Sequence, residues 1–254
     1  NMIQFGIIFL LQLLHLTGAS ESGIVGGHDA KPHSRPYMVS LQVGPHQTCG
    51  GILIRSDFVL TAAHYDLTVV LGAHDITKNE NTQQRISEGK CYKHPKYTGD
   101  FFYDIMLIKL KTNATLNDFV KTIELPKKNG KTRANIKCIA AGWGRTGPSK
   151  PTSAVLREVM VKVQFDNECS YKWGHYFNSE HMMCTHSDKR KGGICQGDSG
   201  GPLICEEKLR GISAYSKQCG CDDPKFPHVF MKIGFFLPWI KEVILARVPI
   251  LSVS

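Results

Sequence analysis

Short apolar or alternating runs recur along most of the chain, and turn-forming residues separate them. Several of these runs are rich in valine and isoleucine, which favour strands. They cover residues 36–43, 51–60, 67–72, 104–110, 137–141, 156–165 and 202–215. Such a series predicts an all-β protein, built as a sandwich or a barrel. Residues 235–248 differ, because their apolar positions from Trp239 to Ile244 recur at the spacing of one helix face, which predicts a C-terminal helix.

The first segment has another character. Residues 2–16 are almost all apolar, and the small or polar residues Thr17 to Ser20 follow them. This order is typical of a secretory signal peptide and predicts cleavage after Ala19, so that residues 1–19 are removed. A buried N-terminal helix is the alternative, but the run ends at small residues and not at a helix cap. No later stretch approaches the roughly 18 apolar residues of a membrane span, so we expect a secreted protein without one.

The chain of 254 residues has 31 basic and 22 acidic residues, a formal net charge of +9. A basic balance favours a polyanionic partner, such as an anionic proteoglycan or a membrane surface, although an ordinary solvated surface explains it equally well. No motif indicates nucleic-acid binding. Residues 113–115 (Asn-Ala-Thr) form an N-glycosylation sequon, which a secreted chain could use.

Nine cysteines in a secreted chain predict disulfides, and the odd count leaves at least one thiol over. A metal site is the other common use of cysteines. The sequence has no Cys-x-x-Cys pair, and its single Cys-x-Cys, at Cys219 and Cys221, has no partner cluster. We therefore expect no metal and no cofactor.

Residues 197–202 (Gly-Asp-Ser-Gly-Gly-Pro) give the sharpest indication of chemistry. A nucleophilic serine needs a tight, exposed turn whose backbone N–H groups point at the developing oxyanion, and glycines permit such a turn. The serine also needs a base and a group that orients the base. The candidates are His64, which follows a predicted strand, and Asp104, which opens an apolar run where an unpaired charge is unusual. Taken alone, a glycine-rich loop with a serine is as often an ordinary turn as a functional one, and a lone histidine is more often structural.

The order His64, Asp104, Ser199 resembles that of the chymotrypsin-like serine proteases. Other segments resemble the same family over essentially all of residues 24–245: residues 24–27 (IVGG), 141–144 (AGWG) and 236–240 (FLPWI). Residues 32–38 and 71–74 look more specifically like granzymes and mast-cell proteases. The resemblance implies two antiparallel β-barrels that divide near residues 120–135, with the active site between them, a C-terminal helix and a tail at 246–254.

The resemblance also implies roles for individual residues. Ser199 attacks the scissile carbonyl of a protein or peptide substrate, His64 takes its proton and passes it to the leaving amine, and Asp104 orients His64. The N–H groups of Gly197 and Ser199 form the oxyanion hole. These roles describe a secreted serine endopeptidase, which we expect to be a monomer.

Asp198 has a separate role in this family, because it pairs with the new amino group of Ile24 after cleavage and so shapes the oxyanion hole. The residue before the cut is Gly23, which argues against trypsin-type activation after lysine or arginine. Signal cleavage after Ala19 would leave residues 20–23 as a propeptide of two dipeptides. Granzymes resemble this in having short propeptides that a dipeptidyl peptidase removes, so we expect the same activation here, and storage in secretory granules.

By resemblance, two disulfides join Cys138 to Cys205 and Cys169 to Cys184, and a third joins Cys195 to Cys219 or, alternatively, to Cys221. The family normally has a cysteine directly after the catalytic histidine, bonded to the position of Cys49, but Tyr65 stands there in this chain. The loss of such a disulfide typically costs about 2–5 kcal/mol. Two explanations stay open: a true deletion that weakens the enzyme, or an error in the assignment of a splice junction.

The substrate pocket also departs from the family pattern. Its floor is Gly193, where trypsins have aspartate, so cleavage after lysine or arginine is disfavoured. Ser216 and His228 replace glycines of the pocket wall and should narrow it. A basic residue at the position of His228 is found in granzyme B-like enzymes with acidic P1 preference, which suggests an acidic or small polar P1 residue, with a chymase-like preference as the alternative.

A second class of function stays open. Ala214 replaces a serine that normally donates a hydrogen bond to the triad aspartate, and this change adds to the missing cysteine. Together with the basic charge, these departures suggest a catalytically weak or dead relative that acts as a cationic binding or antimicrobial protein. The complete set of His64, Asp104 and Ser199 favours the active endopeptidase.

Overall fold

The computed structural model describes residues 24–44, 46–63, 68–187 and 192–246. The predicted signal peptide and propeptide, His64 with Tyr65, and most of the predicted tail lie outside these residues. In the described ranges, no helix is both long enough and apolar enough to cross a membrane.

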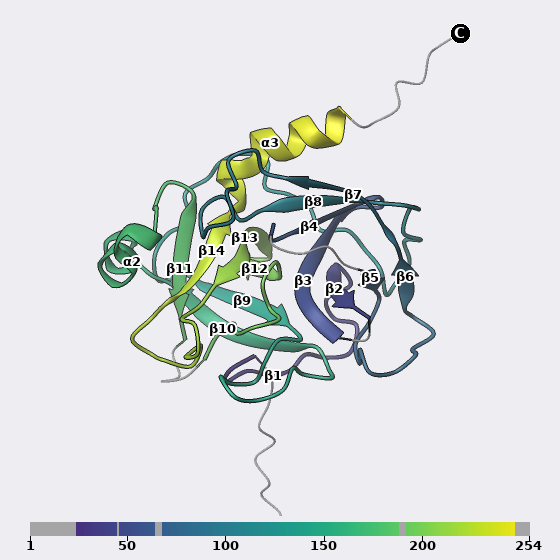
Figure 1. The fold of residues 1–254 in the computed structure, drawn as a ribbon, viewed down its shortest axis with the longest axis horizontal. Coiled ribbons are helices and arrows are strands. Elements are labelled where there is room, and N and C mark those ends of the chain that lie inside the picture. Colours follow the sequence, from purple (N-terminus) through teal and green to yellow (C-terminus); the bar gives the residue numbers. More distant parts are fainter. Residues whose placement is uncertain (1–23, 45, 64–67, 188–191, 247–254) are drawn as a thin grey trace, which may run out of the picture.

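Two seven-stranded antiparallel sheets make up the molecule, which confirms the predicted all-β fold (Figure 1). The first sheet has the strand order β6-β5-β2-β3-β4-β8-β7. Its strands are β2 (Met38–Val43), β3 (His46–Arg55), β4 (Phe58–Thr61), β5 (Thr68–Leu71), β6 (Gln84–Ile86), β7 (Glu88–Lys93) and β8 (Met106–Leu110).

The second sheet has the order β1-β10-β11-β14-β13-β12-β9, and an additional pairing of β10 with β9 closes it into a barrel. Its strands are β1 (His28–Asp29), β9 (Lys137–Gly142), β10 (Arg157–Val163), β11 (Met182–His186), β12 (Pro202–Cys205), β13 (Lys208–Tyr215) and β14 (His228–Lys232). Closure leaves no unpaired edge between β9 and β10.

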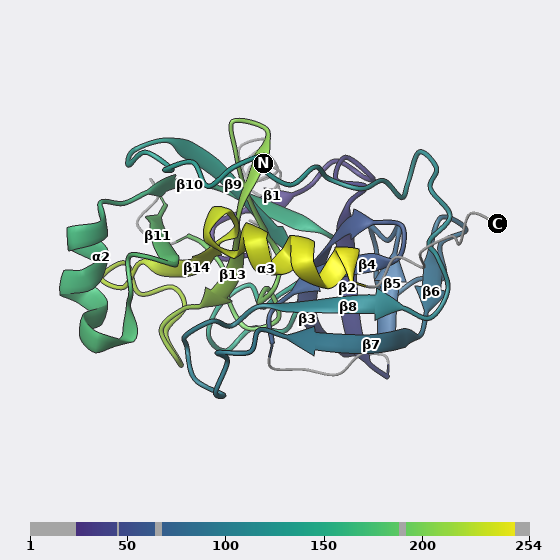
Figure 2. The ribbon, with the colours of Figure 1, turned by 90° about the horizontal axis from the view of Figure 1, so that it is seen from above.

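The predicted C-terminal helix is present as α3 (Ile233–Leu245). One face of it is buried through Ile233, Phe236, Leu237 and Ile240, as the spacing of apolar residues requires. Figure 2 shows α3 lying across the middle of the molecule, over the region where the two sheets meet. The pattern did not predict α2 (Asp166–Trp173) or the short 3₁₀ helix η1 (Gly174–Tyr176), because α2 is largely polar and buries only Cys169.

One large apolar cluster joins the two sheets. It contains Ile52, Phe58 and Leu60 from the first sheet, Met182, Val229 and Met231 from the second, and Phe236 and Ile240 from α3. Each sheet also has an apolar cluster of its own. Burial of this shared cluster holds the two halves in a fixed relation, which matters because the predicted site residues come from both.

Candidate active site

The loop that carries Ser199 is held by backbone hydrogen bonds on both sides. Within the loop, the Gly201 N–H donates to the Asp198 carbonyl at 2.9 Å. Across to the first sheet, the Gly50 N–H in β3 donates to the Ser199 carbonyl at 2.8 Å, and across to β13 the Gly200 N–H donates to the Ser213 carbonyl at 2.7 Å. The nucleophile candidate is therefore tied to both halves of the molecule.

Glycine is required at two positions of this loop. Gly197 and Gly200 have φ angles of +95° and +82°, in the region that side chains rarely adopt. A Cβ on Gly200 would also collide with the Thr61 side chain and the Gly50 carbonyl. These constraints explain why the sequence has glycine at positions 197 and 200, on either side of Asp198 and Ser199.

Ser199 is partly exposed and lines a cavity of about 600 Å³. Its Oγ lies 3.5 Å from the Ala214 carbonyl oxygen. Gly197 is also partly exposed, and among the described residues no acceptor binds the N–H groups of Gly197 or Ser199. Two such donors beside a hydroxyl can stabilise an oxyanion in the cavity.

Asp104 lies between Tyr103 and the start of β8, and only 5% of its surface is exposed. Its Oδ1 accepts the N–H of Ala63 at 2.6 Å. Ala63 follows β4 and directly precedes His64, so the carboxylate contacts the segment that leads to the histidine. His64 itself lies outside the described residues.

Asp198 is completely buried. Its Oδ1 accepts the Gly144 N–H at 2.8 Å and its Oδ2 accepts the Cys195 N–H at 2.9 Å. Burial raises the pKa of Asp198 to about 7, although these two donors act in the opposite direction. A Cβ on Gly142 or Gly144 would collide with the carboxylate, which explains the glycines of the 141–144 segment.

Comparison with known proteins agrees with this geometry. The family model Trypsin matches residues 24–240. The chain belongs to the trypsin family. Its curated relatives include granzyme B(G,H) of Mus musculus, 43% identical over 93% of this chain and 97% of the relative, and chymase of Papio hamadryas, 42% identical with the same coverage. Cathepsin G of Homo sapiens is 39% identical over 92% of both chains.

A solved structure of mouse neuropsin, a serine protease, superposes with a TM-score of 0.81. It is 34% identical in sequence and covers 87% of this chain and all of its own. The protein is thus a chymotrypsin-like serine endopeptidase with granzyme- and chymase-like relatives, as its sequence motifs imply.

His228, predicted for the wall of the substrate pocket, lies in the second barrel at the start of β14. Its ring is buried and bridges two backbone segments: the Ile194 N–H donates to Nδ1 at 3.0 Å, and Nε2 lies 3.0 Å from the Cys221 carbonyl oxygen. Since Nδ1 accepts a hydrogen bond, the proton is on Nε2, which donates to Cys221. Burial lowers the pKa of His228 to about 4, so the ring is uncharged at neutral pH.

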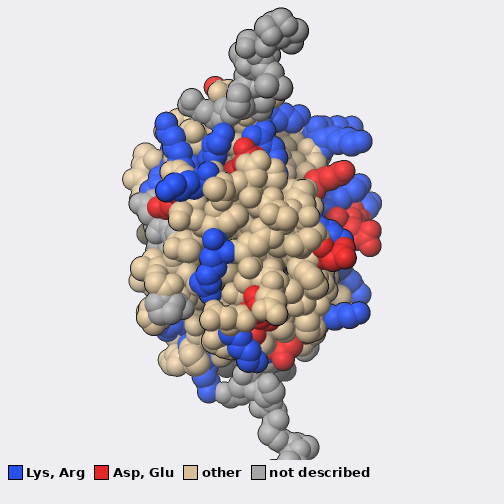
Figure 3. All heavy atoms as spheres, turned by 90° about the vertical axis from the view of Figure 1, so that its right-hand side faces the viewer, with Lys and Arg blue, Asp and Glu red and all other residues tan. Residues whose placement is uncertain are grey.

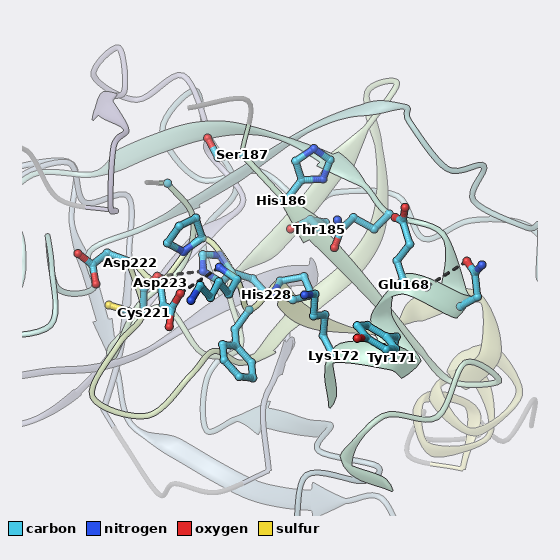
Figure 4. Close-up of a pocket in the computed structure, with 17 residues that line it drawn as sticks. Glu168, Tyr171, Lys172, Thr185, His186, Ser187, Cys221, Asp222, Asp223 and His228 are labelled. Atoms are coloured by element: carbon cyan, nitrogen blue, oxygen red, sulfur yellow. Dashed lines mark hydrogen bonds between the residues drawn. The ribbon is translucent and has the colours of Figure 1, made fainter. Parts of the chain in front are cut away.

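Gly193 and His228 interlock. Gly193 has a φ angle of +139°, and a Cβ on it would collide with the His228 ring. Of the predicted pocket residues, Ser216 lines the cavity that contains Ser199, whereas His228 lines a second cavity of about 790 Å³. Figure 4 shows this second cavity, with His228 and Cys221 at one side.

Three disulfides are present among the described residues. Cys138 is bonded to Cys205 and Cys169 to Cys184, as the resemblance implies. Cys195 is bonded to Cys221, so the assignment to Cys219 is wrong and the alternative is right. The reason is burial: Cys221 is buried against Val25 and Cys195, while Cys219 has a positive φ angle and is exposed.

Cys49 is buried in the first sheet and takes no part in these three disulfides. Burial raises the pKa of its thiol, and the negative charges of Asp104 and Asp198 raise it further. The residue is therefore within electrostatic reach of two predicted functional carboxylates, and its surroundings favour the neutral thiol.

Proposed function

We propose that this protease is a secreted endopeptidase whose catalytic residues are Ser199, His64 and Asp104. The observation that supports it best is the convergence of two distant segments on the β3–β4 region. Gly50 of β3 donates to the Ser199 carbonyl, and Ala63, after β4, donates to the Asp104 carboxylate. His64 is the next residue after Ala63.

The reaction then follows from the chemistry of these groups. Ser199 Oγ adds to the scissile carbonyl while His64 takes its proton, and the N–H groups of Gly197 and Ser199 bind the oxyanion. His64 returns the proton to the leaving amine as the C–N bond breaks, which leaves an acyl-enzyme on Ser199. Water hydrolyses the ester with His64 again as base.

We propose further that cleavage before Ile24 switches the enzyme on. A fully buried carboxylate with a pKa near 7 lacks the cation that would keep it ionised, and among the described residues no basic group forms an ion pair with Asp198. The new amino group of Ile24 is the cation we assign to it. Gly23 before the cut suits removal of residues 20–23 by a dipeptidyl peptidase.

For the residue on the amino side of the scissile bond, we propose a small polar side chain in preference to an acidic one. Both ring nitrogens of His228 are occupied by backbone groups, and its lowered pKa of about 4 leaves no positive charge at neutral pH. The ring also occupies the space that a side chain on Gly193 would fill, and we expect this to make the pocket shallow. Replacement of His228 by alanine should shift cleavage toward larger P1 residues, as a P1 peptide library would report.

Secretion, granule storage and proteoglycan binding are parts of the same proposal. The net charge of +9 supports a polyanionic partner. Figure 3 shows one face of the molecule, on which lysine and arginine side chains surround an area with few charges. Acidic side chains lie among the basic ones along the right-hand edge of this face. Heparin affinity chromatography at increasing salt tests this partner.

A catalytically weak or dead cationic binding protein is the second candidate. The observation in its favour is Ala214, whose methyl group offers no hydrogen bond at the place where the family has a serine. Labelling with a fluorophosphonate, on protein matured to begin at Ile24, separates the two candidates. Labelled wild-type protein and unlabelled Ser199→Ala support the endopeptidase, whereas inert wild-type protein contradicts it.

A further inference from the structure

We propose that three stacked aromatic rings, those of His94, Tyr103 and His181, position Asp104 for catalysis. We refer to these three side chains as the aromatic stack. They are positioning residues, because none of them needs to touch the substrate. The inference rests on the proposed function, which gives Asp104 its part in the reaction.

The Tyr103 ring lies between the two imidazoles, nearly parallel to both. Its centroid is 5.1 Å from that of His94, with an interplanar angle of 13°, and 4.5 Å from that of His181, with an angle of 17°. Stacked rings at such separations attract each other beyond the effect of their buried area. Tyr103, the residue before Asp104, is therefore packed on both faces of its ring, by His94 and by His181.

The members of the aromatic stack come from three separate parts of the fold. His94 follows β7 of the first sheet, Tyr103 belongs to the loop before β8, and His181 directly precedes β11 of the second barrel. Helix α3 closes the arrangement, because Phe236 meets His94 edge-on at 5.3 Å. The aromatic stack thus ties the Asp104 loop to both halves of the molecule and to the helix that lies across them.

The backbone at Tyr103 explains why such a clamp is needed. Its φ angle is +55°, which is uncommon for a bulky residue and costs conformational energy. The turn is stabilised by a hydrogen bond from the Ile105 N–H to the Tyr103 carbonyl at 2.7 Å, and the His94 N–H donates to the Ile105 carbonyl at 3.0 Å. A relaxed φ at Tyr103 would swing the next residue, Asp104, away from Ala63.

His181 distinguishes this role from ordinary packing. It is only 1% exposed, and within the described part of the chain neither ring nitrogen has a hydrogen-bond partner. Burial lowers the pKa of His181 to about 4, with Glu180 opposing and Lys232, His94 and Lys96 adding to that effect. Buried polar atoms without partners are costly, so an aliphatic residue would fill this space better unless the flat ring is itself required.

The test is the pH dependence of the reaction of Ser199 with a fluorophosphonate, measured on protein that begins at Ile24. His181→Leu and Tyr103→Asn remove a ring, and asparagine tolerates the positive φ angle. His181→Phe and Tyr103→Phe keep the rings. His33→Leu is the matched control, a histidine whose ring packs edge-on against Phe119 instead.

We expect His181→Leu and Tyr103→Asn to react about 10-fold more slowly, and the acid limb of their pH profile to move to lower pH. A displaced Asp104 stabilises the His64 cation less, so the apparent pKa of the base falls. The two phenylalanine variants and the control should react within about twofold of wild type, with an unchanged profile.

Three results would overturn the inference. Unchanged pH profiles in His181→Leu and Tyr103→Asn would mean that the aromatic stack contributes only to packing. Equal losses of rate in the two phenylalanine variants would show that ring stacking does not position Asp104. An inert wild-type protein would overturn the proposed function and this inference with it, whereas a reactive wild type confines the failure to the aromatic stack. Melting temperatures identify a variant that fails to fold, and the second variant, from the other half of the molecule, then decides.

Discussion

The loops of Ser199 and Asp104 are built in opposite ways. The Ser199 loop is fixed by backbone hydrogen bonds to β3 and β13, and by glycines that nothing larger can replace. The Asp104 loop has a positive φ angle at Tyr103 and relies on side chains from two other segments, those of His94 and His181. The nucleophile is therefore supported locally, and the orienting acid is supported by tertiary packing.

The largest effect should come from the acid. Asp104→Asn should lower kcat by about 10⁴-fold with a small change in KM, because the amide cannot hold the base in the correct tautomer. Single-turnover and steady-state kinetics measure this loss. A decrease of less than about 10-fold would mean that Asp104 has no orienting role, so that the packing around its loop would have no part in catalysis.

Gly144→Ala should have the next largest effect, on the side of Ser199. The added Cβ collides with the buried Asp198 carboxylate, so the Ser199 loop must shift, and we expect a loss of about 100-fold or more in kcat/KM. Gly147→Ala is the matched control in the same loop region, since its Cβ would meet only the flexible Lys150 side chain at 3.3 Å. Equal activity of the two variants would contradict this account of the loop.

The pH dependence of stability tests the buried acid itself. In the precursor the pKa of Asp198 is raised to about 7, so the native state binds a proton that the unfolded state has lost above pH 4. Its stability should therefore fall as pH rises from about 4 to 7. In the mature form the Ile24 amino group keeps Asp198 ionised and removes this penalty.

Differential scanning calorimetry of Ser199→Ala protein, with and without the propeptide residues 20–23, measures that difference. The melting temperature of the mature form should gain on the precursor by several degrees between pH 4 and 7. The gain should shrink above about pH 8, where the amino group loses its proton. Parallel curves for the two forms would count against the pairing of Ile24 with Asp198.

The smallest expected effect is a gain. Ala214→Ser should restore a hydrogen-bond donor near Asp104 and raise kcat about two- to twelvefold, since one hydrogen bond contributes about 0.5–1.5 kcal/mol. Ala214→Gly, which adds no donor, is the control. If serine gives no gain in the wild type but does so in His181→Leu, the aromatic stack already supplies the support that the family's serine provides.

The sequence predicts well those features that depend on neighbouring residues. Alternating apolar runs predicted the all-β fold, and helical spacing predicted α3. The glycines of the 197–202 and 141–144 segments are explained by the collisions that a Cβ would make with Thr61 and Asp198. The family resemblance supplied two disulfides that no spacing rule contains.

The features that the sequence missed depend on distant contacts. Nothing near Cys219 or Cys221 says which is buried against Val25, and both stand two residues apart in a turn-rich segment. No local sequence motif marks His94 or His181. Tyr103 lies between their rings only because the first sheet and the second barrel pack against each other. The polar helix α2 has a single buried residue, which leaves no apolar stripe to detect.

The interlock of Gly193 and His228 has a consequence for the order in which this pocket can change. Any side chain on Gly193 collides with the imidazole, and so an aspartate that would attract lysine or arginine cannot be accepted while His228 is present. Removal of His228 must come first, and it breaks the bridge between Ile194 and Cys221. A change toward tryptic cleavage, whether by evolution or by design, would therefore replace His228 before Gly193. It would pass through a variant that lacks the bridge between Ile194 and Cys221.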